Sequence, residues 1–419
     1  MKRRAFLAAA SLLPLFVSPE ALAAKKKNTE KNTSKKSSAK SSSKKSSKKS
    51  SSSRKETSSS RPQAQPHTTA ENSVLDSAHP GSSATRLPPV KAPEPPALWR
   101  TFEVSTTVQL QSSRGRQRLW LPLPLNQDTL YQRNLGHTWQ GNFELGSLRR
   151  LPDGDLEAFY CEWKEGVTPR LELVTTVTTA DRHFDVSRRT LPPEREDILR
   201  RNLHASRLLP NDGEAYKLAQ RIIGRILDPV AQARAIFDWV VENTEYDPGL
   251  PGCGSGDVRR QIEQHRFGGR SADINGLFVS LCRAIGIPAR RVFGRRIEQS
   301  RIASGLGIQG DATHAAHCRA EFYVPGYSWI PVDPSDVRRT IAMEGLDLRD
   351  SKLTAMRKIL FGVWEMNWMA YNVAEDLTLP NGPAVPFFTL PRLERPEGAL
   401  DGLDPGSFSY NIRSRQQLG

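Results

Sequence analysis

The stretch of sequence that decides the fold lies in the second half of the chain and reads Gly268-Gly-Arg-Ser-Ala-Asp-Ile-Asn-Gly-Leu-Phe-Val-Ser-Leu-Cys-Arg-Ala-Ile-Gly-Ile-Pro-Ala-Arg290. From Ile274 to Ile285 its apolar residues recur at i, i+3, i+4, i+7, i+8 and i+11, the spacing of one face of an α-helix. Gly286 and Pro288 end the pattern, and Ser271-Ala-Asp273 precedes it. The sequence predicts a strongly apolar helix with that triplet at its N-terminus.

Three strands are predicted after this helix, at residues 289–293, 317–324 and 329–333. The turn Pro325-Gly-Tyr-Ser328 joins the last two strands into a hairpin. A further helix is predicted earlier in the chain, because Asp228 is a suitable N-cap and Pro229 suits the first helical position. This segment is therefore expected to form an α+β core.

Residues 99–185 follow a period of two instead. Phe102, Val104 and Val108 alternate with polar residues, and Pro152-Asp-Gly154 is a turn signal. Such alternation is typical of strands with one buried face. We expect an antiparallel, sandwich-like β domain, and nothing in it suggests a reacting group.

The predicted core contains the two elements from which one type of covalent catalyst is built. A nucleophile at a helix N-terminus, with His and Asp on the two strands of a hairpin, is how a Cys-His-Asp hydrolase or acyltransferase is assembled. Both elements, the helix entered through Ser271-Ala-Asp273 and the hairpin that follows it, are predicted in this chain.

Several spaced motifs carry a resemblance to a known family. They are Gly269-Arg-Ser-Ala-Asp273, Gly286-Ile-Pro-Ala-Arg290, His317-Cys-Arg-Ala-Glu-Phe-Tyr323 and Ile330-Pro-Val-Asp-Pro334, with Cys253-Gly-Ser-Gly-Asp257 and Phe361-Gly-Val-Trp-Glu-Met-Asn-Trp368 typical of one bacterial branch. Over about residues 99–415 the chain resembles the transglutaminase-like superfamily. The resemblance implies a papain-like core preceded by the β domain. It also implies acyl transfer at amides, either peptide hydrolysis or glutamine-to-amine cross-linking.

The resemblance implies a candidate catalytic site made of Ser271, His317 and Asp333, and it shows one departure from the family. It implies that His317 is the general base and Asp333 the carboxylate that orients it, whereas Ser271 aligns with the family's cysteine nucleophile. The pKa of a hydroxyl lies far above the ~8.5 of a free thiol, so a helix dipole cannot hold it ionised. We therefore predict a pseudoenzyme that binds peptide or cell-wall material. The alternative is an active Ser-His-Asp amidase or protease.

Two further interpretations of Ser271 stay open. The serine is a deliberate or artefactual replacement of cysteine, or the reactive thiol is displaced to Cys253 or Cys318. Cys318 alternates with His317 along a strand and points to the other face, which leaves Cys253 as the plausible substitute. Cys161 and Cys282 are interpreted as small core residues, and four cysteines do not imply a disulfide framework.

The sequence gives no sign of a cofactor or a metal centre. No spacing of His, Cys and carboxylate resembles a zinc site, and no Gly-rich phosphate loop follows a strand. His265 and His314 are interpreted as loop residues. The arginines of 290–296 are interpreted either as solvated strand ends or as a rim for anionic substrate such as peptide carboxylates.

The first segment of the chain is interpreted as an export signal. Lys2-Arg-Arg4 is a basic region, Ala5 to Val17 is apolar, and Ala21-Leu-Ala23 is a cleavage site. Arg3-Arg-Ala-Phe-Leu7 resembles a twin-arginine signal, which would mean export after folding. We expect a periplasmic or cell-envelope protein. At 13 residues the apolar run is too short to span a bilayer, which needs ~20.

The excess of positive charge lies almost wholly in a tail. The 419 residues include 60 Lys+Arg and 45 Asp+Glu. Residues 1–61 contain 17 of the basic and 3 of the acidic residues, so residues 62–419 are nearly neutral. Residues 24–98 form a Lys/Ser arm and a Pro-rich linker that we expect to be disordered. Its lack of interleaved aromatic residues argues against specific nucleic-acid binding, and anionic envelope polymers are the expected partner. The predicted domains are then 1–23, 24–98, 99–185, 186–345 and 346–419, the last packed on the core as an extension.

Overall fold

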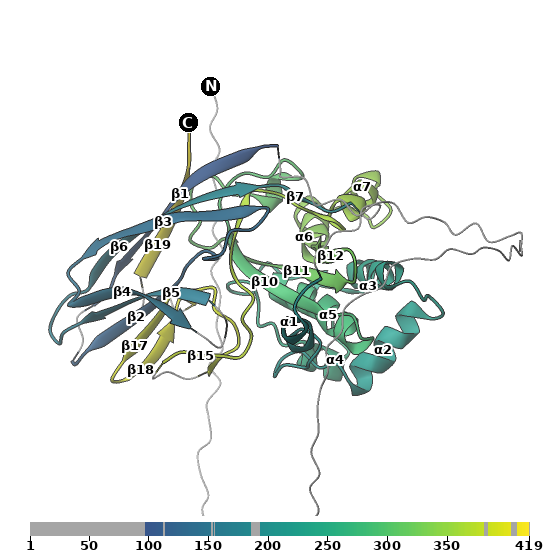
Figure 1. Ribbon diagram of the computed structural model, residues 1–419, viewed down its shortest axis with the longest axis horizontal. Helices are drawn as coiled ribbons and strands as arrows, with labels where there is room; N and C mark the ends of the chain where they lie inside the picture. Colours follow the sequence, from purple (N-terminus) through teal and green to yellow (C-terminus); the bar gives the residue numbers. More distant parts are fainter. Residues whose placement is uncertain are drawn as a thin grey trace, which may run out of the picture. The chain divides into compact units, whose positions relative to one another are not determined.

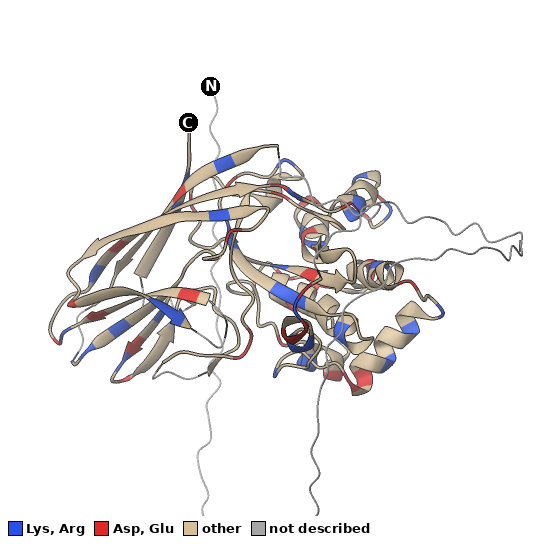
Figure 2. Ribbon diagram, viewed as in Figure 1, with Lys and Arg blue, Asp and Glu red and all other residues tan. Residues whose placement is uncertain are grey.

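The computed structural model describes residues 97–111, 114–151, 154, 156–185, 193–380, 384–403 and 409–418. The predicted export signal and nearly all of the arm lie outside these residues. Within the described part, no helix has the length and apolar character needed to cross a membrane. Figure 2 shows acidic and basic residues interspersed over the same elements.

The helices of the described residues are α1 (Glu196–Arg201), α2 (Gly213–Ile223), α3 (Pro229–Asn243), α4 (Val258–Gln264), α5 (Ser271–Ala284), α6 (Pro334–Glu344) and α7 (Ser351–Ile359), with a short 3-10 turn at Ser304–Leu306. The strands of the core are β8 (Glu245–Tyr246), β9 (Gly268–Gly269), β10 (Ala289–Arg296), β11 (Ala316–Val324), β12 (Ser328–Val332), β13 (Val363–Trp364) and β14 (Trp368–Asn372). The remaining strands are β1 (Trp99–Gln109), β2 (Gln117–Pro122), β3 (Gln132–Gly141), β4 (Leu145–Leu151), β5 (Leu156–Trp163), β6 (Arg170–Ala180), β7 (Arg182–His183), β15 (Leu377–Thr378), β16 (Ala384–Val385), β17 (Arg392–Arg395), β18 (Gly398–Asp401) and β19 (Ser409–Gln417).

The core is an antiparallel sheet with helices packed against it. Its strand order is β12-β11-β10-β14, and α5 packs on β10 and β11 (Figure 1). Helices α2, α3 and α6 also contact α5, so every residue of α5 from Ser271 to Arg283 is buried. This enclosure explains why the helix is apolar beyond a single stripe, since a helix covered on all sides has no solvated face.

The helix starts follow from local sequence. Asp228 caps α3 by accepting a hydrogen bond from the Ala231 amide at 2.7 Å, with Pro229 at the first helical position. Asp333 caps α6 in the same way by accepting from the Asp336 amide at 3.2 Å. The predicted start of α3 agrees with the structure to the residue, and α5 begins at Ser271, within the predicted entry Ser271-Ala-Asp273.

Two antiparallel sheets form the β domain, with strand orders β19-β1-β6-β3 and β18-β17-β2-β5-β4. Leu119, Phe159 and Leu173, from β2, β5 and β6, are among the buried residues of one apolar cluster between them. The sequence prediction placed all of 346–419 on the core. In the structure β14 does join core strand β10, whereas β17 pairs with β2 and β19 pairs with β1 along nine residues. The C-terminal strands thus complete the N-terminal domain.

Candidate active site

Ser271 is the first residue of α5 and is only 4% exposed. Its Oγ accepts a hydrogen bond from the backbone amide of Cys318 on β11 at 3.0 Å. The neighbouring amide of Ala272 donates to the Cys253 carbonyl at 2.8 Å. The hydroxyl therefore lies where the helix start meets the central strand.

Asp273 explains why the chain turns into a helix at this point. Its carboxylate accepts hydrogen bonds from the backbone amides of Arg270 at 2.8 Å and Gly256 at 2.7 Å. A Cβ on Gly254 would lie 1.7 Å from Asp273 Oδ2, and one on Gly269 would lie 2.5 Å from the same atom. Both glycines also have positive φ angles, +99° and +124°. The Gly-x-x-x-Asp spacing is thus a packing requirement of the helix start.

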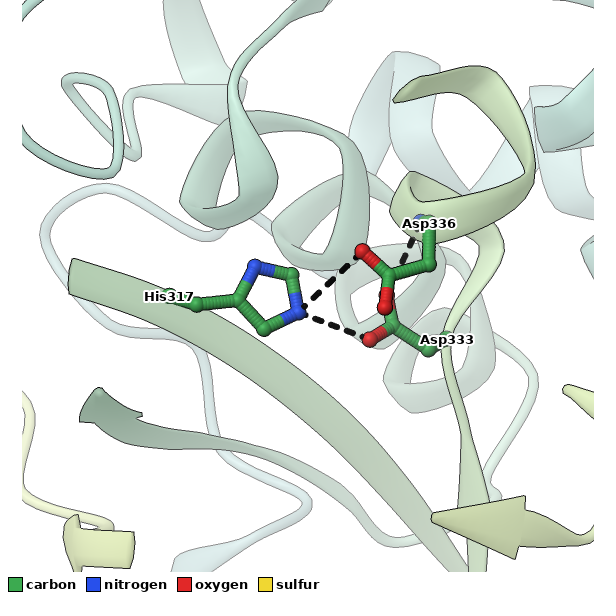
Figure 3. A group of neighbouring side chains, drawn as sticks. All are labelled: His317, Asp333 and Asp336. Carbon is green, nitrogen blue, oxygen red and sulfur yellow. Dashed lines mark hydrogen bonds and ion pairs between the residues drawn. The ribbon is translucent and has the colours of Figure 1, made fainter. Parts of the chain in front are cut away.

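His317 lies on β11, is 4% exposed, and points its Nε2 at two carboxylates (Figure 3). Nε2 is 2.8 Å from Asp333 Oδ2 and 3.5 Å from Asp336 Oδ1. Since carboxylates accept hydrogen bonds, this arrangement assigns the ring proton to Nε2. The acceptor nitrogen of the ring is then Nδ1.

Asp333 is held on its other side by three donors. Its Oδ1 accepts from the Asn275 side chain at 3.0 Å, from Ser335 Oγ at 2.7 Å and from the Asp336 amide. Asn275 also donates to the Cys318 carbonyl at 2.7 Å. The three segments that carry the candidate site are therefore tied together by one buried amide on α5.

Arg296, from β10, lies against the remaining side of the histidine. Its guanidinium donates to His317 Nδ1 at 3.1 Å and to both carboxylate oxygens of Asp336. Burial, and after it the positive charge of Arg296, lowers the pKa of His317 well below its usual 6.5. The ring is therefore neutral at physiological pH, with its acceptor nitrogen engaged by a cation.

Ser271 and His317 line the same cavity, which has a volume of about 220 Å³. Among the hydrogen bonds of the described residues, the Ser271 hydroxyl bonds to the Cys318 amide and not to the imidazole. A covalent catalyst needs its nucleophile within hydrogen-bond reach of its base. The structure brings together His317 and Asp333, and it places Ser271 beside them without that bond.

Neither displaced-thiol candidate fits the chemistry. Cys253 is 2% exposed and lines a separate apolar cavity with Phe387 and Leu390. Burial, and then the charge of Asp273, raises the pKa of the Cys253 thiol to about 11, which opposes thiolate formation. Cys318 is fully buried, and burial raises the pKa of its thiol well above the usual value.

The imidazole and the two carboxylates have a metal-like spacing, with ligand atoms of His317, Asp333 and Asp336 within 4.8 Å of one another. The Arg296 guanidinium, however, already donates to the histidine and to Asp336. A metal ion would have to displace this buried cation, so the donor set is better described as an ion-pair network.

Three of the four arginines of β10 are neither solvated strand ends nor part of a rim around the site. Arg291 and Arg295 are fully buried, and Arg290 pairs with Glu321 while stacking on Trp329 at 3.9 Å. Only Arg296 lines the cavity of the site. Of the two histidines interpreted as loop residues, His265 ends α4 in a left-handed conformation, and the exposed His314 lines the cavity.

Sequence reasoning missed three residues that shape the site. Asn275 and Asp336 carry no motif of their own, although Asp336 follows the Asp333 cap by three residues and so lies in the first turn of α6. Arg296 could be interpreted from the sequence only as part of a strand end or a rim. The branch motif also gains a role, because the Trp368 indole donates to the His317 carbonyl at 3.1 Å and fixes this part of β11.

The α+β core, with a hydroxyl at a helix start beside a His-Asp pair, defines a protein of the papain-like class. A family model described as the transglutaminase-like superfamily matches residues 216–334. An uncharacterised protein of Haemophilus influenzae is 31% identical over 340 residues, which cover 75% of this chain and 91% of that protein. The chain belongs to the transglutaminase-like superfamily.

Two solved structures are similar at lower identity. A candidate cysteine protease from Cytophaga hutchinsonii is 20% identical, with a TM-score of 0.45, and the match covers 76% of this chain and 99% of that one. The periplasmic domain of TgpA from Pseudomonas aeruginosa is 18% identical, with a TM-score of 0.28, covering 56% of this chain and 89% of that one.

Proposed function

We propose that this chain is an exported peptide-binding member of the superfamily that has lost efficient acyl transfer. The observation that carries the proposal is the state of Ser271, whose Oγ accepts a hydrogen bond from the Cys318 amide and has no hydrogen bond to His317 among the described residues. The cavity beside it would hold an amide-containing ligand without turning it over.

The chemistry of the parent reaction explains the loss. Acyl transfer in this family implies a thiolate paired with an imidazolium, and a helix N-terminus assists because its partial positive charge stabilises the thiolate. A serine hydroxyl cannot ionise there. The imidazolium is also disfavoured, because burial and Arg296 lower the pKa of His317. In the serine protein, neither the anionic nucleophile nor the imidazolium of the parent ion pair is therefore favoured.

The second candidate function is an active Ser-His-Asp amidase or protease, and one observation favours it. A neutral histidine with Asp333 at its Nε2 is the state that a general base needs before it takes a proton from a serine. For this function Ser271 Oγ would have to turn towards Nδ1, and the Arg296 guanidinium would have to leave it.

Activity against amides tests the two functions. We would compare the Ser271 protein with Ser271→Ala and Ser271→Cys, using casein hydrolysis and incorporation of an amine donor into casein. We expect no turnover from the serine and alanine proteins. The cysteine variant should alkylate with iodoacetamide below pH 8, faster than a free cysteine, because the helix start lowers the pKa of the new thiol. It should also gain turnover, because the negative charge of that thiolate opposes the lowering of the His317 pKa by Arg296 and favours the imidazolium.

The Cys253→Ala substitution, made in each background, is the matched control for the native thiol beside the helix. Turnover by the serine protein that Ser271→Ala abolishes would establish the amidase instead. Turnover that Cys253→Ala abolishes would identify a displaced thiol. If Ser271→Cys gains neither reactivity nor turnover, the loss of function extends beyond the nucleophile.

Location and partners belong to the same proposal. The signal-like first 23 residues support export to the periplasm or cell envelope, and the Lys/Ser arm suits contact with anionic envelope polymers. Peptidoglycan stem peptides are then available ligands. Cell fractionation of the native chain and of an Arg3→Lys, Arg4→Lys variant tests export by the twin-arginine route, and retention of the variant in the cytoplasm is the expected result.

A further inference from the structure

Two arginines of the site cavity differ from the other arginines of the core. Arg270 precedes Ser271 as the N-cap of α5, and Arg339 lies on α6. Both are half-buried, and neither forms an ion pair with a carboxylate among the described residues. Arg296 and Arg290, in contrast, are paired with Asp336 and Glu321.

Both guanidiniums lie close to one aromatic ring. Arg270 lies 5.9 Å and Arg339 lies 5.3 Å from the ring centroid of Tyr246, which is buried on β8. Arg270 donates to the Leu250 carbonyl at 2.7 Å, and Arg339 donates to the Gly305 carbonyl and the Tyr246 hydroxyl. These neutral acceptors hold each side chain in place without cancelling its charge.

The charges that face the cavity leave a positive excess next to Ser271. Arg270, Arg296 and Arg339 line it together with one exposed carboxylate, Asp311. Arg296 is neutralised by Asp336 behind it. Because a guanidinium binds a carboxylate through two parallel hydrogen bonds, the two remaining arginines lack the partner that suits them.

We propose that the cavity recognises the carboxylate of a peptide ligand, which Arg270 and Arg339 bind beside Tyr246. The inference rests on the proposed peptide-binding function and names its ligand class. A volume of about 220 Å³ is below the roughly 300–1,000 Å³ of sites for drug-sized ligands, so the cavity holds a single carboxylate-bearing residue. That residue would lie next to Ser271, which follows Arg270 in the chain.

The carboxylate also has an expected effect on the histidine. The charge of Arg339 is one of the influences that lower the pKa of His317, after burial, Arg296 and Arg319, while Asp336 opposes them. A carboxylate bound at Arg339 would offset that influence. Ligand binding and the protonation of the base are therefore coupled through one guanidinium.

Three fluorescent peptides test the proposal on the full-length protein: dansyl-Ala-Gln-Ala as the free acid, the same peptide as the C-terminal amide, and dansyl-Ala-Glu-Ala amide. The first and third carry one carboxylate each, at the terminus or on the side chain, and the second has none. By fluorescence anisotropy we expect at least one acidic peptide to bind about tenfold more tightly than the neutral one. Which acid binds distinguishes a terminal from a side-chain carboxylate.

Substitutions assign the preference to the two arginines. Arg339→Gln and Arg270→Gln should each make the acidic peptides bind no more tightly than the neutral one. Arg339→Lys should keep part of the preference for acidic peptides, because it retains the charge. Arg195→Gln removes an exposed guanidinium outside this cavity and should change nothing. Circular dichroism of each variant shows that it is folded, and Arg270→Gln still tests the site if Arg339→Gln does not fold.

The possible results distinguish failure of the carboxylate site from failure of the proposed peptide-binding function. Equal affinity for all three peptides, or a preference that survives in the Arg270→Gln, Arg339→Gln double variant, would overturn the carboxylate site and leave peptide binding intact. Cleavage of the peptides by the native protein would overturn the binding-protein function, while a tenfold preference in KM would uphold the site. Failure of all three peptides to bind would overturn both.

Discussion

The Arg296 guanidinium contacts His317 Nδ1 and both oxygens of Asp336, in a place where all three side chains are buried. Removing one member of such a network leaves a charge without its counterion in a site that excludes water. The stability of the site therefore depends on the complete pair rather than on either residue.

The first prediction concerns this ion pair. Arg296→Met should lower the free energy of unfolding by about 3–5 kcal/mol, because it leaves Asp336 buried and unpaired. The double variant Arg296→Met, Asp336→Leu should recover much of the loss, since neither charge remains. Urea unfolding of the two single variants and the double variant measures this. Equal losses in Arg296→Met and in the double variant would contradict the pairing argument.

The second prediction concerns acid stability. Because the pKa of His317 is lowered in the folded state, above pH 6.5 the residue is neutral in both states and contributes nothing. Below pH 6.5 His317 takes up a proton in the unfolded chain but not in the folded chain. The free energy of unfolding therefore decreases as the pH is lowered, by up to about 1.4 kcal/mol per pH unit. His317→Gln should therefore reduce the slope of unfolding free energy against pH between about 6.5 and 5.

A second histidine, which is half-buried, provides the comparison. Burial lowers the pKa of His137 on β3 to about 4, so His137→Gln should reduce the slope over the same pH range without touching the candidate site. The double variant should lose both contributions, because the two residues lie in different domains. If neither substitution changes the slope of unfolding free energy against pH, other titratable groups determine the loss of stability in acid.

At the residue scale, the sequence was sufficient for the residues that sit at element boundaries. The helix start at Ser271 and the strand that carries His317 could be placed because each leaves a local pattern. The sequence predicts Asp333 at the end of the strand 329–333, but β12 ends at Val332 and Asp333 is the N-cap of α6. Arg296 and Asn275 could not be placed, since their roles come from contacts with residues 21 to 60 positions away in the chain. Such distances are set by the packing of whole elements.

At the scale of elements, the start of α5 depends on the close approach of a loop to Asp273. Gly254→Ala should destabilise the protein more than Gly286→Ala does. Both residues have positive φ, +99° and +86°, so both variants incur about 1–2 kcal/mol of backbone strain. Only at Gly254 would the added Cβ meet a neighbour, 1.7 Å from Asp273 Oδ2, with nothing within 4 Å at Gly286.

Thermal unfolding of the two alanine variants measures the difference. The excess loss in Gly254→Ala isolates the contact between the loop and the helix start, because the strain is common to both. Equal melting temperatures would show that the loop moves away from Asp273 without cost.

Helices α3 and α5 could be located from the sequence because caps and apolar periodicity are local signals. The partners of β1 and β2 could not be read in this way. Gln109 pairs with Ser409, 300 residues further along the chain, and nothing in the alternation of either strand identifies the other. Register between distant strands is decided by the whole fold.

At the scale of the whole molecule, we predict that removal of residues 1–98 leaves the melting temperature unchanged. Residues 25–98 contain no periodic apolar pattern that a core could use, and the residues before them are the predicted export signal. Differential scanning calorimetry of the shortened chain, which begins at Trp99, is the measurement. A fall of several degrees would mean that the arm docks on the folded part.

The pairing of β19 with β1 also has a consequence for synthesis. A ribosome adds about 5–20 residues per second, so the 300 residues between Gln109 and Ser409 take roughly 15–60 s to translate. Throughout that time the edge of β1 that β19 will cover has no partner, and such an edge is prone to pair with other chains. The first sheet of this protein is the last to be finished. A nascent chain therefore exposes this edge until Ser409–Gln417 has been made, and a chain that stops before Ser409 would lack the strand that covers it.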